Sequence, residues 1–209
     1  MTVISLHVGV PHTETRDSGK FVTAGVKTSV ESAELRFDSI VGDGVANHRY
    51  HGGPDRTVCV YPAAHYAWWK SMYGHDLPFG AFSENLTVDG LAESDICIGD
   101  TIRIGTALAQ ITVPRDPCAT MDRITGIASL HILARESGRC GFHMRTLEEG
   151  TMRVGDPFEV VDHDPAHVSV ASVLDLYHGR SQDGALTAML MTMPAFAEEG
   201  KRYLAARQS

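Results

Sequence analysis

The chain has 209 residues, of which 43% are hydrophobic, and its formal net charge is -8 at pH 7. This length and composition predict a water-soluble protein with one domain and an appendage. No apolar run approaches the roughly 20 residues of a membrane-spanning helix, and residues 1–10 lack a signal-peptide pattern, so we expect a cytoplasmic protein with no membrane partner. The acidic balance argues against nucleic acid as a partner, because nucleic-acid binding needs many cations facing phosphates.

From residue 2 to about 163, short β-strand patterns alternate with turn residues. The clearest strand patterns lie at residues 3–8, 34–41, 56–61, 85–88 and 107–113. Two more, at 98–104 and 154–160, each contain a Gly-Asp pair that is typical of a tight entry into a strand. We predict a mainly β fold, a closed or partly closed barrel, with helical insertions at 62–73 and 118–136.

After residue 163 the pattern changes to apolar residues at helical spacing. Breaks near Gly179 and Pro194 divide this tail into three short helices. We therefore divide the chain into a barrel domain, residues 1–163, and a three-helix extension, residues 164–209. We expect the extension to serve packing or partner contact rather than chemistry, and its apolar faces are compatible with a homodimer.

The four cysteines are widely spaced and form no Cys-x-x-Cys pair, so we expect reduced thiols. Cys118 differs from the others because it follows an apolar strand and lies between Arg115 and Arg123. Nearby guanidinium groups favour a thiolate, which is a better nucleophile and a better ligand for a soft metal than the thiol is. The alternative is that Cys118 is a small buried residue with a packing role.

A second group of candidate residues lies in the glycine-rich loop at residues 42–56. Gly52 and Gly53 allow the backbone to approach a ligand closely, and His51 and Arg56 can donate hydrogen bonds to a phosphate or another oxyanion. The alternative is a long turn capped by His and Asn side chains. The loop has the spacing of neither a P-loop nor a zinc site.

Two further segments contain polar residues next to predicted strands. Glu84 could orient a base or a histidine, and Asn85 could bind either a ligand or a turn. In the late turn at residues 137–141 we assign anion contact to Arg139 and a structural role to Cys140.

In chain order these segments contain His-Gly-Gly, Tyr-Pro-x-x-His-Tyr, Glu-Asn-Leu-Thr, Ile-Gly-Asp, Pro-Arg-x-Pro-Cys and Ser-Gly-Arg-x-Gly. This ordered combination resembles the MOSC-domain family, which occurs at the C-terminus of molybdenum-cofactor sulfurases and in stand-alone bacterial proteins. The resemblance covers residues 20–162 approximately. The tail resembles the three-helix extension of the stand-alone branch, which is linked to resistance against 6-hydroxylaminopurine and related N-hydroxylated bases.

The resemblance implies a MOSC-type β-barrel that binds molybdenum cofactor (molybdopterin), with Cys118 as the molybdenum ligand. It also implies that other matched residues bind the cofactor, namely His51, Gly52, Gly53, Asn85, Arg115 and Arg139. We add Arg56 to the cofactor-binding residues because it can donate to a phosphate. His51 and Glu84 are candidates for proton transfer. The chain departs from the family pattern at Ser83, where glycine is common, and in the residues after Cys118.

Our leading functional hypothesis is an oxidoreductase in which Cys118-bound molybdenum reduces a small-molecule N-hydroxylated substrate, with electrons from an external electron-transfer partner. An alternative is a carrier that delivers the cofactor, or its sulfur, to a partner enzyme. A third hypothesis is a thiol hydrolase in which His51 activates Cys118. Loss of activity in a folded Cys118→Ala variant would support direct ligation.

Overall fold

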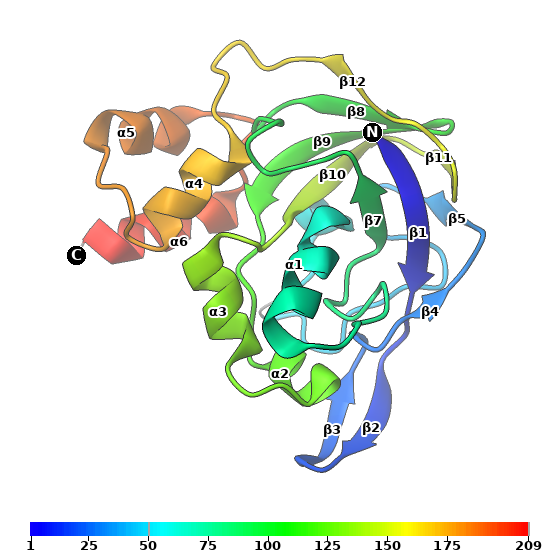
Figure 1. Ribbon diagram of the computed structural model, residues 1–209. Helices are drawn as coiled ribbons and strands as arrows, with labels where there is room; N and C mark the ends of the chain where they lie inside the picture. Colours follow the sequence, from blue (N-terminus) through cyan, green and yellow to red (C-terminus); the bar gives the residue numbers. More distant parts are fainter. Residues whose placement is uncertain (50, 209) are drawn as a thin grey trace.

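The computed structural model describes residues 1–49 and 51–208, and its centre is an eight-stranded β-sheet (Figure 1). Neighbouring strands follow the order β12, β8, β9, β10, β6, β7, β1 and β4. Their bounds are Thr2–Val8 (β1), Thr28–Ser29 (β4), Val58–Pro62 (β6), Leu86–Asp89 (β7), Thr101–Ile104 (β8), Ala107–Pro114 (β9), Phe142–Glu148 (β10) and Phe158–Asp162 (β12). The pairs are antiparallel except β6 and β7, which run parallel.

The sheet curls until β1 meets the residues just before β12. Val3 N donates to Asp156 O over 3.0 Å, and Gly155 N donates to Val3 O over 2.8 Å. Phe158 N donates to Met1 O over 3.0 Å. These bonds satisfy backbone groups that an open sheet edge would expose. The prediction of a mainly β, barrel-like fold with helices is confirmed.

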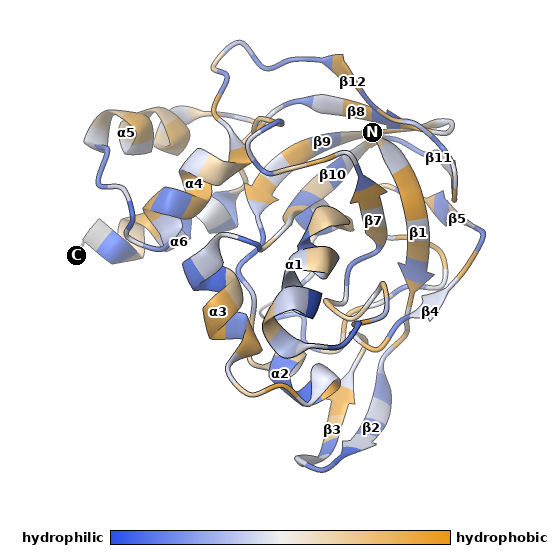
Figure 2. Ribbon diagram, in the orientation of Figure 1, coloured by the Kyte–Doolittle hydropathy of each residue, from blue (hydrophilic) through white to orange (hydrophobic). Residues whose placement is uncertain are grey.

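The strands form because apolar side chains recur on the face that points into the barrel. Along β9, buried and half-buried residues alternate before the strand becomes fully buried. Phe142 and Phe158 are both buried, and their ring centroids lie 6.4 Å apart. Figure 2 shows hydrophobic residues along β1, β7 and β9, whereas the connecting loops are more hydrophilic.

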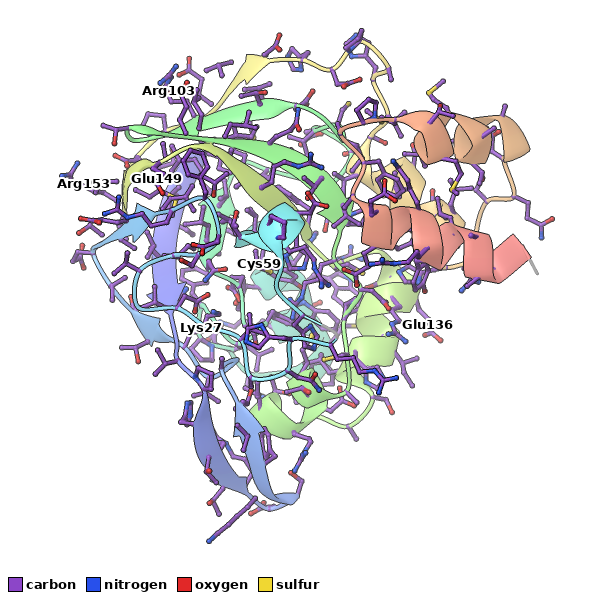
Figure 3. All side chains as sticks on the ribbon, turned by 180° about the vertical axis from the view of Figure 1, so that it is seen from behind. Lys27, Cys59, Arg103, Glu136, Glu149 and Arg153 are labelled. Carbon is purple, nitrogen blue, oxygen red and sulfur yellow. The ribbon has the colours of Figure 1, made fainter. Side chains whose placement is uncertain are left out.

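Two small sheets accompany the barrel. Strands β2 (His12–Arg16) and β3 (Gly19–Thr23) form a hairpin that projects from it (Figure 1). Strand β5 (Ser32–Leu35) pairs with β11 (Gly150–Arg153). In Figure 3, Lys27 and Cys59 lie toward the middle of the molecule, whereas Arg153 lies at its rim.

Helix α1 (Ala64–Tyr73) connects the parallel strands β6 and β7 and anchors an aromatic cluster against the barrel. Its Trp69 is fully buried, and Nε1 of Trp69 donates to the Tyr61 hydroxyl over 2.7 Å. The Phe82 ring stacks on Tyr61 with centroids 4.5 Å apart. Such contacts combine a large buried apolar area with a satisfied polar group.

The second predicted insertion, residues 118–136, contains two helices rather than one. Helix α2 (Thr120–Thr125) ends at Gly126, which has φ of 74°, and α3 (Leu130–Ser137) follows. The Gly126 amide donates to Asp122 O over 2.8 Å. A left-handed glycine at this position closes a helix, because it has no Cβ to oppose the conformation. A single-turn 3₁₀ helix, η1 (Pro54–Arg56), precedes β6.

The tail forms three helices, as predicted: α4 (Val170–Tyr177), α5 (Gly184–Thr192) and α6 (Glu198–Gln208). One apolar cluster runs from the barrel into these helices, and Ala197 N donates to Thr112 O over 3.1 Å. Within the described residues, no helix has the length and apolar character needed to cross a membrane.

Gly141 provides a test of the close packing between the late turn and β6. A Cβ at Gly141 (φ +73°) would lie 2.3 Å from Val60 O, whereas one at Gly126 (φ +74°) would meet no atom within 4 Å. We expect Gly141→Ala to lower the free energy of unfolding by about 3 kcal/mol or more, and Gly126→Ala by about 1 kcal/mol, because only Gly141 adds a backbone clash to the conformational cost. Urea denaturation measures both values, and equal losses would contradict this account.

Candidate functional site

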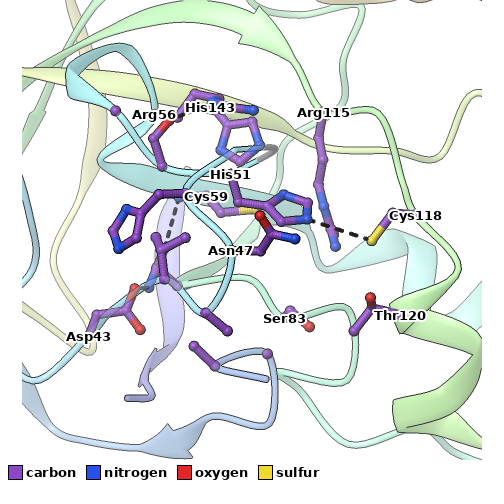
Figure 4. Close-up of a pocket in the computed structure, with 18 of the residues that line it drawn as sticks. Asp43, Asn47, His51, Arg56, Cys59, Ser83, Arg115, Cys118, Thr120 and His143 are labelled. Carbon is purple, nitrogen blue, oxygen red and sulfur yellow. Dashed lines mark hydrogen bonds between the residues drawn. The ribbon is translucent and has the colours of Figure 1, made fainter. Parts of the chain in front are cut away.

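A cavity of about 860 Å³ lies beside the glycine-rich loop (Figure 4). Its wall also includes the residues after β3, the end of β9, the cysteine loop (residues 115–119), one residue of β10 and part of the C-terminal extension. The predicted site residues that line it are His51, Gly52, Gly53, Arg56, Asn85, Arg115 and Cys118. The structure does not bring Glu84 or Arg139 to this wall.

Cys118 faces His51 across the cavity, with 4.0 Å between Cys118 Sγ and His51 Nε2 (Figure 4). Burial opposes ionisation of the thiol, but hydrogen bonds from His51 and from the Thr120 hydroxyl and amide outweigh it and lower the pKa of Cys118 to about 6. The side chain is therefore mainly a thiolate at neutral pH, so it can act as a nucleophile or bind a soft metal.

Arg115 points into the same cavity as His51 and Cys118 (Figure 4). The backbone amide of Arg115 donates to Gly141 O over 3.0 Å, which fixes the start of the cysteine loop beside the late glycine turn. Its Nη1 is buried and has no hydrogen-bond partner among the described residues. Burial opposes its charge, but the thiols of Cys59 and Cys118 raise the pKa of Arg115, so the guanidinium is a permanent cation in the wall.

The prediction that Arg123 also stabilises the Cys118 thiolate is wrong. The Arg123 guanidinium lies over the Phe21 ring, 3.8 Å from its centroid, and Nη2 contacts Lys20 O at 3.4 Å. This cation-π contact ties α2 to the β2–β3 hairpin. His51 and Thr120, rather than a second arginine, supply the stabilisation of the thiolate.

The glycine-rich loop turns into η1 through two left-handed residues, Gly52 (φ +79°) and Gly53 (φ +95°). Arg56 Nε donates to Gly52 O over 3.0 Å, so the helix holds the turn that presents His51. Arg56 Nη1 also pairs with Glu199 Oε2 at 2.6 Å, which links this loop to α6. Tyr50, which is part of the same loop, lies outside the described residues.

Asn85 lines the cavity, and its side-chain amide joins three segments of the chain. Its Oδ1 accepts from Cys59 N over 3.0 Å, and its Nδ2 donates to His7 O over 3.1 Å and to Asp43 Oδ2 over 2.9 Å. Asp43 in turn accepts from Gly9 N over 2.8 Å and pairs with the Lys27 ammonium. These bonds make Asn85 a residue that positions the glycine-rich loop.

Glu84 is fully buried behind the cavity wall. Its Oε1 accepts from the Tyr66 hydroxyl over 2.5 Å and from Gly80 N and the Thr87 hydroxyl, both over 2.8 Å. These contacts place Glu84 in the scaffold under α1. The preceding residue, Ser83, does line the cavity and has φ of 61°, a left-handed value that explains why glycine suits this position.

Arg139 also lies away from the cavity. Its guanidinium stacks on the Trp68 ring at 4.1 Å from the centroid, and Nη1 donates to Ser137 O over 3.1 Å. The Arg139 carbonyl accepts from the Tyr61 hydroxyl over 3.2 Å. The residue therefore joins the late turn to α1 and the aromatic cluster.

The site also contains residues that sequence reasoning missed. His143 lies on β10 between the core residues Phe142 and Met144. Because neighbouring side chains of a strand point to opposite faces, His143 points away from the core and lines the cavity. Its Nδ1 is buried without a partner among the described residues. Burial, then Arg56 and Arg115, lower the pKa of His143 well below its usual value, so the imidazole is neutral.

The extension contributes Tyr177, Glu199 and Tyr203 to the wall, although we expected it to have no part in the site. Spacing along the chain could not reveal this contact. Among residues 1–49 and 51–208, no group of three or more His, Cys, Asp or Glu residues is arranged to hold a metal ion.

The thiolate assignment predicts the pH dependence of Cys118 alkylation. In protein from a host that makes no molybdenum cofactor, the rate of Cys118 modification by iodoacetamide should rise with a midpoint near pH 6, because the rate follows the thiolate fraction and the pKa is about 6. In His51→Gln the midpoint should move upward. Mass spectrometry measures both rates, with Cys97 as the internal control, since burial and then Asp100 raise its pKa. A midpoint near pH 9 in the wild type would contradict the assignment.

Comparison with known proteins identifies the family. YflK of Bacillus subtilis is 38% identical over 170 residues, which cover 81% of this chain and 77% of YflK. A protein of Gibberella moniliformis named reductase is 29% identical over 149 residues, which cover 69% of this chain but only 26% of that protein. The crystal structure of YiiM from Geobacillus stearothermophilus matches 100% of this chain and 99% of its own with a TM-score of 0.84 and 28% identity.

A family model described as MOSC domain matches residues 47–159, which include most of the glycine-rich loop, the cysteine loop and the late turn. MOSC domains are associated with binding of molybdenum cofactor. His51, Cys118 and Arg115 therefore lie within the matched region, whereas part of the cavity wall comes from residues before 47 and from the extension. This chain belongs to the MOSC domain family.

Proposed function

We propose that this protein is a molybdenum-cofactor-binding oxidoreductase that reduces N-hydroxylated bases or related N-hydroxylated compounds, with the Cys118 thiolate as a ligand of molybdenum. The observation that carries the proposal is the low-pKa thiolate held by His51 beside the Arg115 cation in one cavity. Membership of the MOSC family supports the choice of cofactor.

The residues of the cavity fit such a cofactor. Its volume of about 860 Å³ lies in the upper part of the usual range of ligand sites, about 300–1,000 Å³. The buried Nη1 of Arg115 has hydrogen-bonding capacity to donate to an anionic group. At Gly53 a Cβ would meet no atom within 4 Å, so the loop backbone is open to a ligand. A thiolate is a suitable ligand for a soft metal.

When bound, the cofactor would supply the two-electron chemistry that removes oxygen from the substrate. In the overall reaction two electrons cleave the N–O bond, one proton adds to the nitrogen to give the amine, and a second proton joins the departing hydroxyl to give water. Cys118 would hold the metal, and Arg115 would bind an anionic part of the cofactor. His51, which contacts Cys118, is placed to hold or move a proton at Nε2. Glu84 has no part in this scheme.

We propose that the electrons come from an external electron-transfer partner. The Gibberella relative named reductase supports a redox role, although the match covers only a quarter of that protein. Delivery of cofactor without turnover would instead assign the carrier function.

Molybdenum and pterin content tests the ligand assignment. We expect purified wild-type protein from a host that makes the cofactor to contain both, and Cys118→Ser to lose molybdenum and all reduction of 6-hydroxylaminopurine by reduced methyl viologen, because a neutral hydroxyl replaces the thiolate. Cys97→Ser is the matched control, since Cys97 lies outside the cavity and should keep wild-type content and rate.

Retained molybdenum and turnover in Cys118→Ser would overturn the direct-ligand assignment. If wild-type protein carries no cofactor even after it is supplied, the oxidoreductase proposal fails. Thermal unfolding of each variant checks that a loss of molybdenum or of turnover does not come from a loss of fold.

A further inference from the structure

One wall of the cavity comes from the C-terminal extension, outside the region that the family model matches. Tyr177 comes from α4, and Glu199 and Tyr203 come from α6. The rings of Tyr177 and Tyr203 pack together with centroids 4.3 Å apart. We call these three residues the extension wall.

Glu199 is the charged member of the extension wall. Its Oε2 pairs with Arg56 Nη1 at 2.6 Å, and its side chain is still 44% exposed. A carboxylate has two oxygens and about four acceptor positions, so the ion pair with Arg56 leaves capacity for a ligand. Arg56, only 16% exposed, fixes the direction of this carboxylate and is a positioning residue.

Among the other carboxylates of the cavity, Asp43 and Asp116 are committed to the protein, and Asp38 accepts from the neighbouring Ser39 hydroxyl over 2.9 Å. Asp43 accepts from Gly9 and Asn85 and pairs with Lys27. Asp116 pairs with Arg135 at 2.7 Å. The acceptor capacity at the extension end of the cavity therefore belongs mainly to Glu199.

The position of Glu199 is fixed by close packing of α6 against Tyr177. At Gly200 a Cβ would lie 2.7 Å from the Tyr177 hydroxyl and 2.4 Å from the Phe196 ring. Only glycine permits this approach. Tyr177 is buried, and its hydroxyl has no partner among the described residues, so it adds unused hydrogen-bonding capacity to the extension wall.

We propose that the extension wall recognises the N–H-donating edge of a nitrogen base, with Glu199 accepting a hydrogen bond from the amino nitrogen and the Tyr203 ring contacting the base. The proposal rests on the proposed function, since it names how the substrate of that reaction is selected. A carboxylate accepts from an N–H group and repels a carbonyl oxygen at the same place. Glu199 therefore acts as a specificity-determining residue for amino-bearing heterocycles.

The test uses two purines that differ only in the substituent on C6 as binding probes. Adenine carries an amino group there, whereas 6-methoxypurine carries an ether oxygen and has no N–H donor at C6 or N1. We expect calorimetry to show that the wild-type protein binds adenine at least about tenfold more tightly than 6-methoxypurine, a difference of about 1.4 kcal/mol. In Glu199→Gln this preference should fall to about twofold or less, because an amide can both donate and accept.

Glu198→Gln is the matched control. Glu198 precedes Glu199 on α6 and pairs with Lys201 at 2.7 Å, but it lies outside the cavity and its side chain is 73% exposed. This variant should keep the wild-type preference.

Glu199→Gln should keep the wild-type cofactor content. Its KM for 6-hydroxylaminopurine should rise about tenfold, with kcat little changed.

An equal preference in Glu199→Gln and Glu198→Gln would overturn the inference, as would a wild-type protein that binds 6-methoxypurine as tightly as adenine. The binding ratio needs no turnover. It therefore decides the role of Glu199 even if the cofactor or reduction experiments fail, and those experiments decide the proposed function separately.

Discussion

The hydrogen bonds of the Asn85 side chain are the constraint on which the rest of the site depends. One amide group bonds to β6 at Cys59, to β1 at His7 and to the glycine-rich loop at Asp43. The loop has few apolar residues with which to pack, so buried polar bonds take the place of a core. Asp43 extends the network to Lys27. The position of His51 opposite Cys118 follows from this anchoring.

The electrostatics of the cavity are asymmetric. Near the cysteine loop, Arg115 is a buried cation and the Cys118 thiolate forms close to it, while the imidazole of His143 stays neutral. At the extension the main charges are the paired Arg56 and Glu199. One end of the cavity therefore suits an anionic or metal-bearing ligand, and the other end suits hydrogen bonding to a neutral group.

Periodic apolar residues predicted the barrel strands and the three terminal helices. Only the family resemblance, carried by the order of the motifs, implied that Cys118, Arg115 and the His-Gly-Gly segment share one site. The direction of long side chains was not predictable, because Arg123 lies against Phe21 and Arg139 against Trp68, and both rings are distant in sequence. Glu84 faces inward for a related reason, since it binds Tyr66 of helix α1, which lies 18 residues earlier in the chain. His143 was recoverable from strand alternation, whereas Glu199 required the tertiary contact between α6 and η1.

The continuous apolar cluster links the unfolding of the terminal helices to the unfolding of the barrel. Val173 and Leu204 belong to the same cluster as Ile111 and Phe142 of the barrel. Elements that share one core tend to open together, so hydrogen exchange in the terminal helices and in the central strands would occur in one cooperative event. The cavity between them is then either fully assembled or lost, without a populated state in which the barrel persists with an open wall.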